Sequence, residues 1–209
     1  MSHCTKFSFK YTDEGAIVKA FKKMNVKCST EMVSTFKSDF SKKVLGKLGY
    51  LGQRQYRAII GSTGGFNLFL CKIADNDYEL MIERDVVSAS DGARMTELAD
   101  NFRRAYMEIA VDEIVRKLDK GNMPSKTEKQ KDKFIVHFGS ALEYSVVVSF
   151  ANGEITEEVT GVKGDFCTRL TEDIENMLSH PTAELHTEWK AEYTMQIEDQ
   201  NIQVLSLSF

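Results

Sequence analysis

Residues 144–160 have the sequence YSVVVSFANGEITEEVT, in which two strand-like runs flank the dipeptide Asn152-Gly153. The first run carries three consecutive valines at 146–148, and valine has a high propensity for strands. An Asn-Gly pair between two such runs favours a two-residue turn whose twist matches that of the flanking strands. The sequence therefore predicts that residues 155–160 pair back on residues 144–150 as a hairpin.

Strand and helix patterns continue on both sides of this hairpin. Residues 134–138 form another strand-like run, and residues 202–209 alternate between apolar and polar from Leu205 onward. Between them, Asp165 can cap a short helix that stops before Pro181, since proline cannot continue a helix. The apolar residues of this predicted helix recur at four-residue spacing: Phe166, Leu170, Ile174 and Leu178.

The first half of the chain begins with a strand pattern and then a helix pattern. Residues 4–10 alternate, with Phe7 and Phe9 on one face, and Thr12 is the predicted helix N-cap. The apolar stripe of that helix is Ile17, Ala20, Phe21 and Met24. Residues 28–55 are less regular, and their apolar residues indicate a further helical face. That face consists of Met32, Val33, Phe36 and Phe40.

A second hairpin and a long helix follow. Alternating apolar residues mark two strands, 66–70 and 78–82, on either side of turn-forming residues at 75–77. Residues 94–118 carry a helical apolar stripe, and Gly121 is placed to end that helix. The stripe is Met95, Leu98, Phe102, Ala105, Ile109 and Ile114.

The two halves are separated by a polar stretch. Residues 121–132 are rich in charges and contain only Met123 as a large apolar residue, which is typical of an exposed linker. The sequence therefore predicts an α+β protein of two small modules, each an antiparallel hairpin-based sheet packed by one or two helices. The modules are residues 1–120 and residues 133–209, the second a ββα unit with a terminal strand.

The composition is that of a folded protein in a reducing compartment. Hydrophobic residues make up 42% and charged residues 28%, unlike the composition of disordered chains. No signal peptide is recognisable, and no apolar run approaches the roughly 18 residues of a membrane span. The four cysteines are scattered, without a Cys-x-x-Cys pair, so no disulfide framework or zinc ribbon is indicated. We expect a soluble protein of the cytoplasm or an equivalent compartment such as the plastid stroma.

The charge of the chain disfavours a nucleic-acid partner. The formal net charge is -4 and the pI about 5.7, so the cationic field that dominates nucleic-acid affinity is missing. The N-terminal part is nevertheless locally basic, which favours a solvated face and leaves nucleic-acid binding as an alternative. Its basic residues are Lys19, Lys22, Lys23, Lys27, Lys37, Lys42, Lys43, Lys47, Arg54 and Arg57.

The sequence carries no recognisable catalytic or metal-binding motif. Gly61, Gly64 and Gly65 lack the Lys-Ser/Thr that follows in a phosphate-binding loop, so they indicate a turn. His180 and His186 do not have the i, i+4 spacing that places two imidazoles on one helical face. We therefore expect no metal and no cofactor.

Cys167 falls in the first turn of a predicted helix, where the helix dipole can lower the pKa of a thiol. No histidine can be assigned as its base, so a structural cysteine is favoured over a nucleophile. Trp189 and Tyr193 lie in a charged segment where exposed aromatic residues can anchor a partner, although packing on their own hairpin is favoured. A cluster of acidic residues is most simply explained by exposed strand and helix faces: Glu154, Glu157, Glu158, Glu172, Asp173 and Glu175.

Two family resemblances add to these patterns. Residues 1–118 resemble the hypothetical chloroplast reading frame thirty-five family of plastids and cyanobacteria. The matching residues are Met1-Ser2-His3-x-Thr5-Lys6, Gly65-Phe66-Asn67, Asp77-x-Glu79-Leu80 and Arg103-Arg104-Ala105-Tyr106. The second module is similar to the domain-of-unknown-function family twenty-nine ninety-seven. There the pattern is Asn152-Gly153, Glu157-x-Val159-x-Gly161-x-x-Gly164-x-x-Cys167, Leu170-Thr171-x-x-Ile174-Glu175 and Glu192-Tyr193.

These resemblances imply a partner rather than a reaction. Bacterial members of both families are similar in genomic company, often beside a gene for an AAA+ ATPase, and neither family has an activity to carry over. We therefore expect a non-enzymatic adaptor or accessory subunit, with an AAA+ ATPase as a partner candidate. The alternatives are a cysteine-dependent enzyme or redox protein and a nucleic-acid-associated module. The candidate interaction residues are Gly161, Gly164, Cys167, Thr171, Glu175, Trp189 and Tyr193. The oligomeric state is left open.

Overall fold

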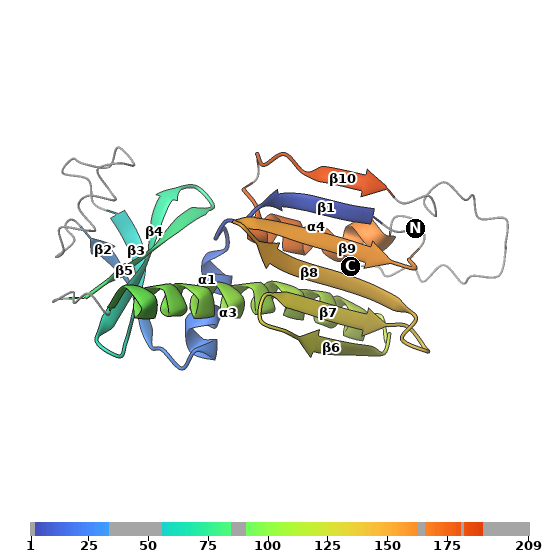
Figure 1. The fold of residues 1–209 in the computed structure, drawn as a ribbon, viewed down its shortest axis with the longest axis horizontal. Coiled ribbons are helices and arrows are strands. Elements are labelled where there is room, and N and C mark those ends of the chain that lie inside the picture. The colour runs from blue at the N-terminus through green and yellow to red at the C-terminus, as the bar shows by residue number, and fades with distance from the viewer. Residues whose placement is uncertain (1–2, 34–55, 85–90, 163–165, 181, 190–209) are drawn as a thin grey trace. The chain divides into compact units, whose positions relative to one another are not determined.

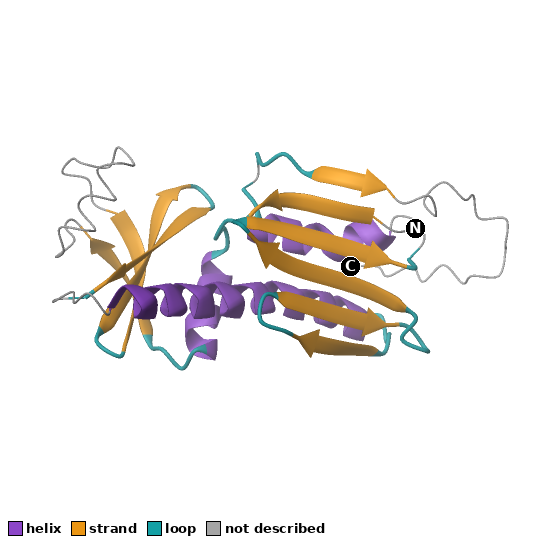
Figure 2. Cartoon of the chain, in the orientation of Figure 1, coloured by secondary structure: helices purple, strands orange, loops and turns teal. Residues whose placement is uncertain are grey.

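The computed structural model describes residues 3–33, 56–84, 91–162, 166–180 and 182–189. Within these ranges the chain forms two antiparallel sheets and three helices, so the predicted α+β class is confirmed (Figure 1 and Figure 2). The elements are, in chain order, β1 (His3–Ser8), α1 (Glu14–Lys23), β2 (Cys28–Val33), β3 (Tyr56–Thr63), β4 (Phe66–Ala74), β5 (Asp77–Glu83), α3 (Asp91–Lys120), β6 (Ser125–Lys129), β7 (Lys133–Phe138), β8 (Tyr144–Ala151), β9 (Glu154–Thr160), α4 (Phe166–Leu178) and β10 (His186–Trp189).

The chain divides into two compact units. The central unit is residues 10–109, and the terminal unit joins residues 1–9 with residues 110–209. This division differs from the two modules expected from the sequence, because β1 pairs with β9 and so belongs to the sheet formed by the second half of the chain. Pairing between strands about 150 residues apart leaves no local pattern in the sequence.

The terminal unit contains a six-stranded sheet in the order β10-β1-β9-β8-β7-β6. Alternate residues of its inner strands β7 to β9 are buried, as the two-residue period of a strand requires. The apolar ones among them are Phe134, Val136, Phe138, Val146, Val148, Ile155 and Val159. Helix α4 lies behind this sheet in Figure 1 and buries an apolar stripe of its own. The stripe includes Leu170, Ile174 and Leu178, as the four-residue spacing predicts.

The two predicted hairpins are both present. β8 and β9 pair in antiparallel register, with Phe150 opposite Ile155. Asn152 and Gly153 between them have φ angles of 54° and 86°, which are the positive values that this turn needs. β4 and β5 pair in the central unit in the same way, with Leu70 opposite Leu80.

The predicted linker at residues 121–132 contains a strand. β6 pairs with β7 along its whole length and forms one edge of the six-stranded sheet. Its sequence, SKTEK, has no apolar residue, so neither periodicity nor composition marks it as a strand. Polar and charged residues are common on edge strands because they discourage pairing with other chains.

The central unit contains the four-stranded sheet β2-β3-β4-β5. One face of β4 carries Phe66, Leu68 and Leu70, all fully buried, on the same side as Gly61 of β3. The ring of Phe21 from α1 lies against Gly61, so closely that a Cβ atom there would be 2.4 Å from Cε1 of Phe21. Gly61 therefore serves this close approach within a strand, whereas only Gly64 and Gly65 form the turn expected of the three glycines.

The opposite face of this sheet carries a second apolar cluster. It consists of Ala58, Phe69, Cys71 and Met81, with Ile60 packed against it. Strand β4 is thus buried on both faces, which explains its nearly continuous apolar sequence, FNLFLCKIA.

Two predictions for the start of the central unit are wrong. The N-cap of α1 is Asp13, whose Oδ1 accepts the backbone N–H of Ala16 at 2.6 Å, whereas Thr12 lies one residue before the cap. Met32 and Val33 belong to strand β2, which pairs with β3, and so do not form a helical face. Phe36, Phe40 and the predicted strand 202–209 lie outside the described residues.

Candidate functional site

The predicted interaction residues of α4 are mostly packing residues. Cys167 and Thr171 are both fully buried on the inward face of the helix. The Thr171 hydroxyl donates to the carbonyl oxygen of Cys167 at 3.3 Å, one turn earlier. A thiol closed off from solvent cannot reach a substrate in this conformation, which counts against Cys167 as a nucleophile.

Helix α4 is fixed to the C-terminal part of α3 by one lysine. The ammonium group of Lys117 donates to the carbonyl oxygen of Arg169 at 2.7 Å and forms an ion pair with Asp173 at 2.9 Å. Phe166 is the first residue of α4. Glu175 is half-buried, and its carbonyl oxygen accepts from the backbone N–H and the hydroxyl of Ser179, which closes the end of the helix.

Gly161 has a conformational role at the end of β9. Its φ angle is +83°, in a region that residues with a Cβ atom rarely adopt. A Cβ atom at this position would also lie 2.9 Å from Cδ1 of Tyr144. Gly161 therefore allows the chain to turn under the tyrosine ring. Gly164 and Tyr193, the other two candidates of this group, lie outside the described residues.

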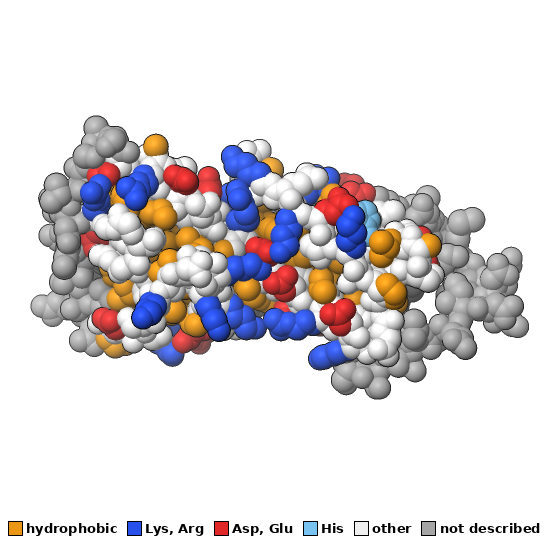
Figure 3. Space-filling model, turned by 90° about the horizontal axis from the view of Figure 1, so that it is seen from below, with side chains coloured by type: hydrophobic (Ala, Val, Ile, Leu, Met, Phe, Trp, Pro, Cys, Tyr) orange, Lys and Arg blue, Asp and Glu red, His pale blue; other side chains and the backbone are white. Residues whose placement is uncertain are grey.

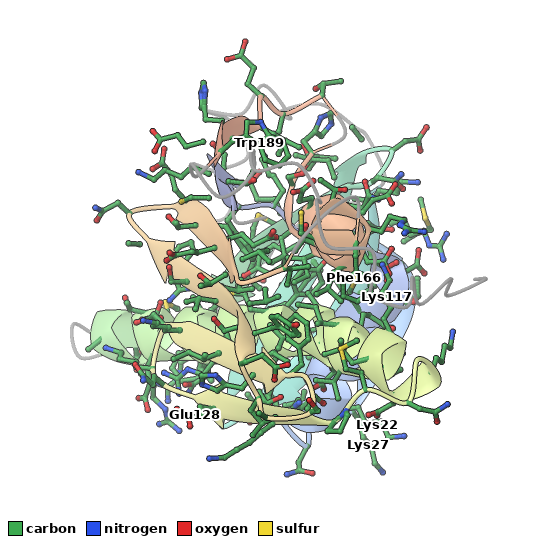
Figure 4. All side chains as sticks on the ribbon, turned by 90° about the vertical axis from the view of Figure 1, so that its right-hand side faces the viewer. Lys22, Lys27, Lys117, Glu128, Phe166 and Trp189 are labelled. Carbon is green, nitrogen blue, oxygen red and sulfur yellow. The ribbon has the colours of Figure 1, made fainter. Side chains whose placement is uncertain are left out.

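Trp189 is the predicted candidate that the structure leaves accessible. It is 46% exposed and ends β10, and Leu185, just before β10, is 42% exposed. Among the described strands β10 pairs with β1 and stands last in the strand order. Figure 4 shows Trp189 at the opposite end of the sheet from Glu128 of β6. We call residues 185–189 the β10 edge.

The β10 edge is held in place by a contact that crosses nearly the whole length of the chain. Thr187 of β10 lies opposite Thr5 of β1, and their hydroxyl groups are 3.1 Å apart, within hydrogen-bond distance. Thr5 is fully buried on the helix side of the sheet. Thr187 therefore faces the same side, and the alternation of a strand places His186 and Glu188 on the opposite face.

On that opposite face the charges next to the β10 edge are separated by sign. His186 lies beside Lys6 of β1. Glu188 lies beside Cys4 of β1, and Cys4 lies beside Glu158 of β9. Lys6 thus lies beside the start of the β10 edge, and Glu158 and Glu188 lie two residues further along it.

One acidic residue of the matching segment is not on a solvated face. Glu157 is fully buried on the helix side of the sheet, between Thr5 of β1 and Val148 of β8. The prediction of exposed faces for the acidic cluster is therefore wrong for this residue. The period of two in β9 could have indicated it, because Glu157 shares its parity with Ile155 and Val159.

The basic N-terminal region does not form a uniform cationic surface where it is described. Lys23 forms an ion pair with Glu108 at 2.8 Å, and Arg57 forms one with Glu14 at 2.6 Å. Figure 3 shows acidic and basic side chains interspersed on the face that it draws. These observations give the nucleic-acid alternative no support.

No group of three or more His, Cys, Asp or Glu side chains in the described ranges is arranged to hold a metal ion. One ring nitrogen of His180, a histidine considered above as a metal ligand, is engaged locally, since its Nδ1 lies 2.7 Å from the Thr182 hydroxyl. None of the helices in these ranges combines the length and the apolar character needed to cross a membrane.

Comparison with known proteins places one family on this part of the chain. Residues 147–194 match the family described as Protein of unknown function (DUF2997), which confirms the predicted resemblance of the second module. The matched range includes most of β8, all of β9 and α4, and the β10 edge. The resemblance of residues 1–118 to the chloroplast reading frame family is not confirmed. No curated protein and no solved structure matches the chain.

Proposed function

We propose that this chain is a non-enzymatic adaptor or accessory subunit that acts through protein–protein contacts. The observation that supports this role is the β10 edge, where Leu185 and Trp189 are 42% and 46% exposed at the rim of a sheet. Large apolar side chains exposed at the rim of a sheet supply binding energy to a partner. Tryptophan is also enriched among the residues that dominate binding energy.

The β10 edge lies inside the segment that matches the family, which is the reason to prefer it over other exposed apolar residues. Met32 of the central unit is 60% exposed, but it lies outside the matched residues 147–194. The first partner class to test is an AAA+ ATPase, on the strength of the resemblance alone. The burial of Cys167 favours this adaptor role over a cysteine-dependent enzyme.

Affinity capture tests the proposal. The tagged full chain is used to capture proteins from its native cells, with and without ATP, beside the double variant Leu185→Ser/Trp189→Ser. The control is Met32→Ser, which removes an apolar side chain elsewhere that is more exposed, at 60%. We expect a stoichiometric partner that the wild type and the control retain and that the double variant loses. Equal recovery of that partner by the double variant would contradict a role for the β10 edge.

A further inference from the structure

We infer that Asn152, in the turn between β8 and β9, is a deamidation site, where the backbone nitrogen of Gly153 attacks the side-chain carboxamide of Asn152 and expels ammonia. The inference concerns the chemistry of the turn and does not rest on the proposed function. Three observations carry it: the exposure of the turn, the hydrogen bonding of its two central residues, and the absence of a side chain at Gly153.

The two reacting groups are accessible. Asn152 and Gly153 are exposed, as are the residues on either side of them, so water reaches the turn. In the described part of the chain, no hydrogen bond involves the Asn152 carboxamide or the Gly153 N–H. The hydrogen bond from the N–H of Phe9, at 3.0 Å, reaches a different atom, the carbonyl oxygen of Gly153. Neither reacting group therefore has to give up a partner.

Among the asparagines of the sequence, Asn152 alone is followed by glycine. A side chain on the following residue obstructs the approach of the backbone nitrogen to the carboxamide, and glycine has none. Two other asparagines with positive φ angles, Asn25 and Asn122, are followed by N–H groups that are already used. These N–H groups donate to the carbonyl oxygens of Phe21 and Leu118, each at 2.9 Å.

The reaction needs water as its co-reactant. The Gly153 nitrogen forms a bond to Cγ of Asn152, the Cγ–Nδ2 bond breaks, and ammonia leaves with the proton of the Gly153 N–H. The product is a five-membered succinimide ring. Water then opens the ring at one of its two carbonyl carbons, which gives either aspartate or isoaspartate. In isoaspartate the main chain runs through the side-chain carbon atoms.

The closed turn slows the formation of the ring. Asn152 and Gly153 have φ angles of 54° and 86°, as in a type I′ turn. Ring closure requires the Gly153 nitrogen to rotate about the Cα–C bond of Asn152 until it lies next to Cβ, whereas the type I′ conformation holds it on the far side. The reaction therefore proceeds from open forms of the turn, and its rate measures how often the end of the hairpin opens.

Isoaspartate uncouples the end of the hairpin from β1, because it lengthens the main chain of the turn by one carbon. A two-residue loop fixes the register of its strands, so the longer loop no longer fits the pairing of Ala151 with Glu154. The same turn holds the end of β1 through the hydrogen bond between Phe9 and Gly153. The Phe9 ring also packs edge-on against Phe150, at a centroid distance of 5.6 Å.

Timed incubation of the purified full chain at neutral pH, followed by mass spectrometry of its peptides, measures the conversion. Asn76 is the matched internal control, because it is exposed and has the same φ angle of 54° but precedes Asp77. We expect Asn152 to convert at least about tenfold faster than Asn76 in the same sample, since both turns open locally but only one has an unobstructed nitrogen. In denatured protein Asn152 should convert at least about tenfold faster again, because the turn is then always open.

Two variants separate the causes. Asn152→Gly keeps a sequence suited to the turn but has no carboxamide, so it should stay unmodified. Asn152→Asp carries the charge of the product with an ordinary main chain. Hydrogen exchange at the Phe9 N–H should accelerate in proportion to the isoaspartate content of the incubated wild type and stay slow in both variants.

The possible outcomes are distinct. No conversion of Asn152 in the folded chain, over the time in which the denatured chain converts completely, would overturn the inference. Equal rates at Asn152 and Asn76 would overturn it as well. Unchanged exchange at the Phe9 N–H in converted wild type, or an equal acceleration in Asn152→Asp, would overturn the link between the lengthened main chain and the end of β1.

Discussion

The hydroxyl oxygen of Tyr106 accepts the backbone N–H of Asp13 at 3.0 Å, at the residue that caps α1. It also accepts the backbone N–H of Thr12 at 2.9 Å. Tyr106 is fully buried in α3, so one side chain satisfies two donors at the start of another helix and joins the two helices of the central unit.

Tyr106→Phe removes this acceptor and leaves two N–H groups without it. We expect the free energy of unfolding to fall by about 1–3 kcal/mol, since a buried donor that loses its partner is costly. Denaturant unfolding measures this change, and hydrogen exchange at Thr12 and Asp13 should accelerate. Tyr144→Phe is the control, because the ring of Tyr144 packs beside Phe138 in the terminal unit. Equal losses in both variants would contradict a specific role for the Tyr106 hydroxyl.

Gly61→Ala introduces a methyl group where the Phe21 ring already lies. The contact of 2.4 Å is far inside van der Waals distance, and Phe21 is also held against Phe102 at a centroid distance of 4.7 Å. We expect a loss of about 1–3 kcal/mol in the free energy of unfolding, as for other overpacked cores. Gly92→Ala is the matched control, because a Cβ atom there meets nothing within 4 Å. A neutral Gly61→Ala variant would show that α1 can move away from the sheet.

Alkaline pH is expected to destabilise the central unit through Tyr78. Burial, followed by the hydrogen bond to Glu14, raises the pKa of Tyr78 from 10.0 to about 12. The folded state then holds the phenol proton more tightly than the unfolded state does. The stability that the protonated phenol contributes to the folded state is therefore present below pH 10 and is lost as pH rises towards 12.

Thermal unfolding between pH 9 and pH 12 measures this loss. Tyr78→Phe should weaken the dependence on pH without abolishing it, because burial also raises the pKa of Cys71 to about 12. An unchanged pH profile in Tyr78→Phe would assign the alkaline loss to other groups.

The Cys167 thiol should react slowly with alkylating reagents in the folded protein. It is fully buried, whereas Cys4 is half-buried on the exposed face of the sheet. We expect modification of Cys167 to be at least about tenfold slower than that of Cys4, because it requires local opening. Mass spectrometry of peptides after timed alkylation gives both rates, and denatured protein provides the reference. Rapid modification of Cys167 would instead support the alternative that the chain is a cysteine-dependent enzyme or redox protein.

Much of the fold could be predicted because many of its helices, strands and turns are specified by residues that are close in sequence. The Asn152-Gly153 turn and the stripe of α4 depend on residues close in sequence. The positions that sequence reasoning missed depend on distant partners. Gly61 is understood only when Phe21 is placed against it, and the backbone N–H of Thr12, one residue before the cap, donates to Tyr106 of α3.

In the candidate site, too, the features that depend on distant strands could not be predicted from the sequence. The sequence singles out Trp189 as a candidate anchor in a charged segment, but it favours packing on the hairpin, whereas Trp189 is 46% exposed in the structure. The separation of charge next to Trp189 could not be predicted. Lys6 of β1 and Glu158 of β9 lie near the β10 edge only because β1 pairs between β9 and β10. The burial of Glu157 could have been inferred from the parity of β9, but the high charge of that segment concealed it.

The placement of β1 between β9 and β10 has a consequence for synthesis on the ribosome. β1 is synthesised before the central unit and β9 and β10 after it, so at 5–20 residues per second β1 waits on the order of ten seconds for its partners. All residues of the central unit, 10–109, are complete before that. The central unit can therefore fold as an insertion while the terminal unit is still incomplete. A nascent chain that has released residues 1–109 from the ribosome would carry a complete central unit and a β1 strand without the rest of its sheet.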